Sequence, residues 1–274
     1  MERPVLFGGD GRRCGMLGVP DTVSGPALLF SNAGSLSRIG PNRLWVQLAR
    51  AANTCGFPTL RFDQSGFGDS PVSDVARPIH LRRLEEYNEA VDFVMAETGS
   101  SNVVIVGLCS GAIDAHDVAV ADPRVTASVT IDGYADRTEG FRRRRLLSYA
   151  TSPRRWKSAP RILRQLLTPS TSAPLTESDA LSMSFPDRDR VIEEYRALVA
   201  RRFRTLMIYT GSWSTLVNSP RQLFEAFPEV DFDGLFDVEL WPTVNHTFTV
   251  DMHRARFVSR VLAWIREGNI DEAN

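Results

Sequence analysis

Cys109 stands in a sequence pattern that is typical of an enzymatic nucleophile. It occupies the middle of Gly107-Leu108-Cys109-Ser110-Gly111, directly after an apolar β-branched run and directly before an amphipathic stretch. A sharp turn between a strand and a helix pushes its middle side chain out at the end of a sheet. Residues 107 and 111 must lack bulk because the strand and helix backbones crowd there. Amides at the helix N-terminus favour a thiolate and later an oxyanion, so we predict that Cys109 attacks carbonyl carbon.

The elements that would position this turn follow from the alternation of apolar and amphipathic segments. We expect strands at residues 5–7, 16–19, 27–31, 59–62, 103–107, 125–131, 205–209 and 236–240, the first two forming an antiparallel hairpin. Helices are expected at 43–54, 81–97, 112–121 and 251–267. Strands that alternate with helices predict an α/β fold whose mostly parallel, eight-stranded sheet has helices on both faces.

Residues 137–202 interrupt this alternation. They contain no convincing strand and five prolines, which predicts a helical lid inserted into a core formed by residues 1–136 and 203–274. Within the insertion, residues 137–164 carry nine Arg and one Lys against a single acid. This basic segment is either a solvated face or a docking surface for an acidic partner, with Arg142, Arg143, Arg144 and Arg145 at its centre.

Composition excludes several classes of function. The chain has 274 residues and a net charge of −1, which argues against general nucleic-acid binding. Its apolar runs fall far short of the ~20 residues that span a bilayer, and the first residues do not form a secretory signal. Three widely spaced cysteines predict no disulfide framework, so we expect a reducing cytoplasm. No cluster has metal-ligand spacing, and we expect neither a metal nor another cofactor.

Three motifs together resemble the α/β-hydrolase superfamily, and the resemblance covers almost the whole chain. Residues 61–70 (RFDQSGFGDS) are similar to the R-x-D-x-x-G-x-G-x-S loop after strand 4 of that fold. The resemblance implies that His246 is the catalytic histidine, because it follows the last strand. It also implies an oxyanion hole made by the backbone amides of Ala33 or Gly34 and of Ser110. The other histidines, His80, His116 and His253, and the cysteines Cys14 and Cys55 have no such context.

The chain departs from the family pattern at two positions. The nucleophile is Cys109 instead of serine, and Ser214 stands where the usual acid follows strand 7. A minority of the fold places the acid after strand 6, where this chain has Asp132. We therefore predict that Asp132 orients His246. The rival acids are Asp251, Asp231 and Asp233.

A cysteine nucleophile forms a thioester, which keeps the acyl group activated toward carbon and nitrogen nucleophiles. With the acid after strand 6, the lid and the late histidine, the chain resembles bacterial Dieckmann cyclases of tetramate and pyridone biosynthesis. That resemblance implies a β-ketoacyl-aminoacyl substrate carried as a phosphopantetheine thioester on a carrier protein. Two alternatives stay open: a Cys-dependent thioesterase or dienelactone-hydrolase-like enzyme, and a non-catalytic binding module.

Overall fold

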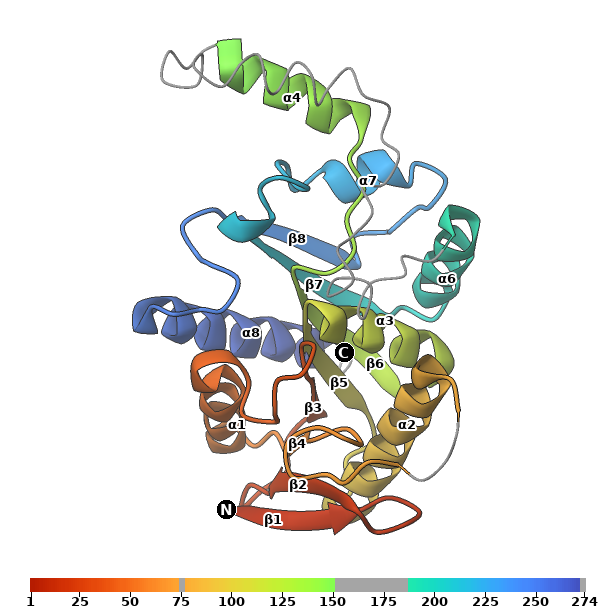
Figure 1. Ribbon diagram of the computed structural model, residues 1–274, viewed down its shortest axis with the longest axis vertical. Coiled ribbons are helices and arrows are strands. Elements are labelled where there is room, and N and C mark those ends of the chain that lie inside the picture. The colour runs from red at the N-terminus through yellow and green to blue at the C-terminus, as the bar shows by residue number, and fades with distance from the viewer. Residues whose placement is uncertain (74–76, 151–186, 272–274) are drawn as a thin grey trace.

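A single eight-stranded sheet organises the chain in the computed structural model, which describes residues 1–73, 77–150 and 187–271 (Figure 1). The strands are β1 (Glu2–Phe7), β2 (Arg13–Gly18), β3 (Ala27–Ser31), β4 (Thr59–Phe62), β5 (Val103–Leu108), β6 (Val125–Ile131), β7 (Arg204–Thr210) and β8 (Phe236–Trp241). All eight predicted strands are present. The sequence predicts that the second strand begins at residue 16, whereas the alternating burial of β2 begins three residues earlier, at Arg13.

The sheet has the strand order β1-β2-β4-β3-β5-β6-β7-β8. β1 and β2 form the predicted antiparallel hairpin, and β2 also pairs antiparallel with β4. All later pairs are parallel. The carboxyl ends of the central strands β3, β5, β6 and β7 therefore meet at one edge, and the loops that leave them share that edge.

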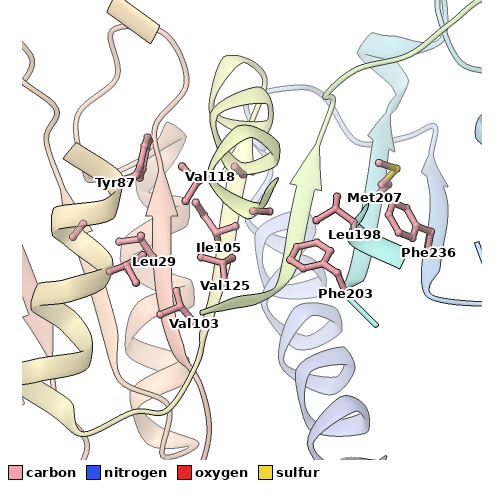
Figure 2. Close-up of a cluster of buried hydrophobic side chains, with 14 of the residues drawn as sticks. Leu29, Tyr87, Val103, Ile105, Val118, Val125, Leu198, Phe203, Met207 and Phe236 are labelled. Carbon is pink, nitrogen blue, oxygen red and sulfur yellow. The ribbon is translucent and has the colours of Figure 1, made fainter. Parts of the chain in front are cut away.

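Helices cover both faces of the sheet (Figure 1). They are α1 (Leu44–Thr54), α2 (Ile79–Thr98), α3 (Ser110–Ala121), α4 (Glu139–Ala150), α6 (Arg188–Ala200), α7 (Gln222–Ala226) and α8 (Asp251–Asp271), with short 3-10 turns η1 (Pro41–Arg43) and η3 (Gly211–Trp213). α1 and α8 bury apolar side chains against one face. α2, α3 and α6 do so against the other, where Leu29, Tyr87, Ile105, Val118 and Leu198 belong to one continuous cluster (Figure 2). The predicted two-sided covering is thus confirmed.

Two helices of the predicted lid segment fall within the described residues, and they differ in their packing. α6 buries Val191, Tyr195 and Leu198 in the same core cluster as the sheet, so it belongs to the covering layer. α4 extends away from the sheet beyond α7 (Figure 1). The remainder, residues 151–186, lies outside the described residues, and the lid stays a prediction. No helix in the described part of the chain is long and apolar enough to cross a membrane.

Candidate active site

Cys109 forms the turn between β5 and α3 in a backbone conformation that side chains rarely adopt. Its φ is 57° and its ψ is −119°. A Cβ at Gly107 would lie 2.1 Å from the carbonyl oxygen of Gly111, and a Cβ at Gly111 would lie 2.7 Å from that of Ser31. Both glycines are therefore needed by the close approach of strand, helix and neighbouring loop. The half-buried Cys109 side chain stands at the N-terminus of α3, as the sequence predicted.

Asp132 follows β6 directly and is fully buried. Its own amide donates to the carbonyl of Ile208 on β7 at 2.9 Å, which continues the pairing of the two strands. The carboxylate accepts hydrogen bonds from the Thr210 amide at 2.7 Å and from the Thr210 hydroxyl at 2.6 Å. A buried carboxylate needs such donors to offset its lost hydration. Thr210 therefore holds Asp132 in a single orientation.

His246 lies in the loop after β8, with its ring directed at Asp132. The ring atom Nδ1 is 2.7 Å from Oδ2 of Asp132. Hydrogen bonds with Asp132 and with Cys109 raise the pKa of His246 to about 9, against the opposing effect of partial burial. His246 is consequently an imidazolium at neutral pH, placed between a carboxylate and the thiol. The structure thus brings Cys109, His246 and Asp132 together, from three loops at the same edge of the sheet.

The loop after β7 contributes to the site without supplying an acid. The hydroxyl of Ser212 accepts a hydrogen bond from the backbone amide of His246 at 3.0 Å. The Trp213 ring stacks on the His246 ring, with centroids 5.3 Å apart and planes 9° apart. Trp213 is itself held by a 3.2 Å hydrogen bond from its Nε1 to the carbonyl of Gly133. Ser214, at the position of the usual acid, is exposed.

Sequence reasoning missed Trp213, and no pattern in the sequence marks it. Its role depends on the orientation of one aromatic side chain against a residue 33 positions away, which only the folded chain defines. The signal that was available is indirect. This loop has Ser214 where the usual acid is expected, so another side chain of the loop, Trp213, can contact His246.

The hydrogen bonds of the backbone amides distinguish the candidate oxyanion donors. From the sequence, the backbone amide of either Ala33 or Gly34, after β3, is predicted to be an oxyanion donor. The Gly34 amide donates to the side-chain oxygen of Ser110 at 2.7 Å, so that amide is already engaged. Among the described residues, the Ala33 amide has no hydrogen-bond acceptor, and the Ser110 amide begins a helix whose first N–H groups are unpaired. Ala33 and Ser110 are therefore the better pair of oxyanion donors, and Gly34 instead ties its loop to α3.

The rival acids lie in other environments. Asp251 is exposed and pairs with Arg254, while Asp233 pairs with Arg202. Asp231 caps the Asp233 amide at 3.1 Å. Within the described part of the chain, none of the three contacts His246. The remaining cysteines are also remote from it: Cys14 donates to the carbonyl of Asp69, and Cys55 accepts from Arg266.

The four arginines of the predicted docking surface do not share one environment. Arg144 bonds to Glu225 at 2.6 Å and to Asn218 at 2.8 Å, which anchors α4 to α7 and its preceding loop. Arg145 packs its guanidinium over the Phe141 ring. Arg142 and Arg143 are exposed, and Arg143 pairs with Glu139 on the same helix. The solvent-facing part of the basic helix is thus the pair Arg142 and Arg143.

Comparison with known proteins agrees with this geometry. The family model described as "Alpha/beta hydrolase family" matches residues 28–266. Among solved structures, the thioesterase domain from the curacin biosynthetic pathway has a TM-score of 0.60 at 16% identity, covering 96% of this chain and 99% of its own. A dienelactone hydrolase from Anabaena variabilis has a TM-score of 0.61 at 15% identity, covering 97% of both chains. DcsB, solved with a substrate analogue, has a TM-score of 0.60 at 16% identity, covering 97% of this chain and 99% of its own.

No curated protein matches the sequence. The sheet order, the strained turn after β5 and the histidine after the last strand define a protein with the α/β-hydrolase fold. The chain belongs to the alpha/beta hydrolase family.

Proposed function

We propose that the protein is an acyl-thioester-processing enzyme that releases a β-ketoacyl-aminoacyl chain by Dieckmann cyclisation, with Cys109, His246 and Asp132 as its catalytic residues. The observation that carries the proposal is the hydrogen-bonded series from Asp132 through His246 to the thiol of Cys109. A thiol in this position stores the acyl group as a thioester, which carbon nucleophiles attack well. The α/β-hydrolase fold brings these residues together, and the cysteine nucleophile favours transfer of the acyl group to carbon.

Before the first step, His246 takes the proton of the Cys109 thiol, which gives a thiolate beside an imidazolium. In the first step, this thiolate attacks the carbonyl carbon of the carrier thioester. The tetrahedral oxyanion accepts hydrogen bonds from the Ala33 and Ser110 amides, each donor contributing about 3–4 kcal/mol to catalysis. The carbon–sulfur bond to the carrier then breaks. The departing thiolate takes the proton of the His246 imidazolium, which leaves His246 neutral and Cys109 acylated.

In the second step, neutral His246 removes the proton from the carbon between two carbonyl groups of the bound chain. The resulting enolate carbon attacks the Cys109 thioester. A carbon–carbon bond closes the ring, and the bond to sulfur breaks to return the Cys109 thiolate beside an imidazolium. Protons and charges therefore balance over the cycle without a further reactant.

The raised pKa of His246 supports its use as a carbon base. An ordinary imidazole has a pKa near 6.5 and is a weak base toward carbon acids. Asp132 is the largest cause of the increase to about 9, and its contribution persists after Cys109 has been acylated. The same contact fixes the ring tautomer, so that the second ring nitrogen faces the substrate.

A Cys-dependent hydrolase uses the same residues and differs only in whether water reaches the acyl group on Cys109. The structural similarity to a thioesterase domain and to a dienelactone hydrolase favours this as the second candidate. The two candidates predict different products from one substrate: a ring for the cyclase and a free acid for the hydrolase.

The deciding experiment incubates a β-ketoacyl-aminoacyl thioester mimic with the wild type, with Cys109→Ala and without enzyme, and identifies products by mass spectrometry. We expect a cyclic product from the wild type alone. Free acid from the wild type alone would establish the hydrolase. If neither product forms, iodoacetamide labelling at neutral pH separates the causes. If Cys109 is labelled no faster than Cys14 or Cys55, the protein is a non-catalytic binding module.

A further inference from the structure

An elongated cavity lies between α3 and α6, on the sheet face opposite α1 and α8. It contains about 640 Å³ of space not occupied by protein atoms, part of it open to solvent. Ser128 and Thr205 form its floor on the neighbouring strands β6 and β7. Tyr195 of α6 and Ala119 of α3 form its sides. The core cluster that surrounds this region includes Val118, Leu198, Phe203 and Met207 (Figure 2).

The cavity runs along the strands toward the catalytic edge of the sheet. Gly133, which follows Asp132, lines one end, together with Ala112 in the first turn of α3. Phe203, which precedes β7, lines the other end. Along β7 the lining runs from Thr205 to Tyr209, which is four residue steps or ~13 Å at the usual rise of a strand. The catalytic end is bordered by the half-buried side chains of Ile113 and Tyr134.

A side-chain hydrogen bond between α3 and α6 closes the outer side of the cavity. Nε2 of His116 on α3 is 2.9 Å from Oε2 of Glu194 on α6. The His116 ring also packs edge-on against Tyr195, with centroids 5.4 Å apart. α3 and α6 are therefore held together over a space that neither helix fills. The side chains that line such a space lose dispersion contacts, so the fold gains nothing from keeping it empty.

The wall carries one carboxylate, Asp117 of α3, which lies 3.9 Å from Arg190, and several of its other polar groups are paired. The Ser128 hydroxyl donates to the hydroxyl of Thr205 at 3.3 Å. The Tyr209 hydroxyl donates to the carbonyl of Tyr134 at 2.6 Å. Most of the remaining lining is aliphatic or aromatic, including Val191, Phe203 and Met207. A polar occupant would find few partners along this mostly apolar lining, whereas a hydrocarbon chain needs none.

We propose that this cavity binds the hydrocarbon tail of the acyl substrate, which makes the preferred substrate a long, linear, apolar acyl chain. The inference deepens the proposed function and rests on its acylation of Cys109. A chain attached to Cys109 crosses the first turn of α3, enters beside Ile113 and Tyr134, and extends along β6 toward Phe203. Ala119 and Phe203 then set the length of chain that is accepted.

The test measures binding without catalysis. Cys109→Ala is titrated calorimetrically with N-acetylcysteamine thioesters of linear saturated acids of increasing length. We expect the Kd to fall roughly three- to fourfold for each added methylene, the value for burial of a CH₂ group, until the chain reaches Phe203. Added to Cys109→Ala, Ala119→Leu should end this trend at a shorter chain and Phe203→Leu at a longer one. Ala121→Leu, the same change at an exposed position of α3, is the matched control and should follow the Cys109→Ala profile.

Each outcome bears on one proposal. A Kd that does not change with chain length, or identical profiles in the Ala119 and Phe203 variants, would overturn the acyl-tail site. Circular dichroism shows whether each variant is folded, and the opposite shift expected from Phe203→Leu remains measurable if Ala119→Leu does not fold. Thiol release from the same thioesters by the wild type tests acylation separately. Its absence alongside length-dependent binding would overturn the proposed function but not the cavity's role.

Discussion

Oδ2 of Asp132 lies 2.7 Å from Nδ1 of His246, although 114 residues separate the two along the chain. The contact is possible because β6 ends beside β7, while the loop after β8 returns across the ends of both strands. Thr210 occupies the strand that usually carries the acid, and here it donates to the acid of the neighbouring strand. The acid thus follows β6, and the residue that hydrogen-bonds to it lies at the end of the adjacent strand β7.

Replacing Asp132 with Asn should lower kcat by about 10³–10⁴-fold, because the amide neither fixes the required tautomer nor stabilises the imidazolium. Asp251→Asn, which alters an exposed acid, is the control and should retain wild-type turnover. Steady-state kinetics with a thioester substrate provides the measurement. Undiminished turnover in Asp132→Asn would show that His246 needs no carboxylate.

The stability of the protein should depend on the proton of His246. Its pKa is about 9 in the folded chain and near 6.5 when unfolded, so the folded state holds this proton more tightly. The stabilisation is complete below pH 6.5 and is lost as pH rises toward 9. Urea unfolding in a Cys109→Ala background removes the contribution of Cys109 and isolates the larger contribution that Asp132 makes to the raised pKa of His246. We expect unfolding free energy to fall by about 1 kcal/mol more across this range than in Cys109→Ala/His246→Gln, allowing for screening of a partly exposed ring. If the unfolding free energies of the two variants change equally with pH, the prediction is wrong.

Trp213 should act as a positioning residue for His246. Removing the stacked ring in Trp213→Leu should lower kcat by about tenfold, the equivalent of the roughly 0.5–1.5 kcal/mol that aromatic pairs contribute, with little change in KM. Trp213→Phe retains a stacking surface and should recover most of the loss. A merely structural role would instead lower the melting temperature of both variants and leave kcat unchanged.

The backbone strain at Cys109 should be measurable as stability. Cys109→Gly removes the Cβ from a conformation with φ of 57° and should raise the free energy of unfolding by about 1 kcal/mol, after subtracting the entropy that glycine adds to the unfolded chain. Cys109→Ala keeps the Cβ and serves as the control without this gain. Chemical denaturation of the two inactive variants decides the matter, and equal stability would mean that the turn is unstrained.

Reversing the charges of Arg142 and Arg143 to Glu should weaken turnover of a carrier-bound substrate by about tenfold or more, while a small thioester mimic is processed normally. These side chains are exposed, so the fold should tolerate the change. Arg144→Glu is a useful contrast, because it breaks the contact with Glu225 and should destabilise α4 for either substrate. Equal losses on both substrates in the double variant would remove the case for carrier docking.

Local chemistry explains which features could be predicted from sequence. The strands are short apolar runs with breaks on both sides, and the turn at Cys109 requires glycines at fixed spacing. Asp132 was predictable because it directly follows a buried strand and because Ser214 left the usual position without an acid. Each of these signals lies within a few residues of the feature it marks.

The features that sequence did not reveal depend on side-chain directions in the folded chain. The choice between Ala33 and Gly34 is decided by the Ser110 hydroxyl, which takes the Gly34 amide. Consecutive arginines on α4 differ in the same way. Arg144 anchors the helix to Glu225, whereas Arg142 and Arg143 are exposed to solvent. The stack of Trp213 on His246 likewise has no counterpart in local sequence.

That stack also gives the protein an internal optical reporter. A protonated imidazole in contact with an indole quenches its fluorescence, whereas a neutral imidazole does so weakly. The emission of Trp213 should therefore brighten whenever His246 gives up its proton, including the moment at which the carrier thiol departs. Stopped-flow fluorescence of the unlabelled enzyme would then time the proton transfers of a single turnover. The Trp213→Phe variant would serve as the reference for the emission of the other four tryptophans.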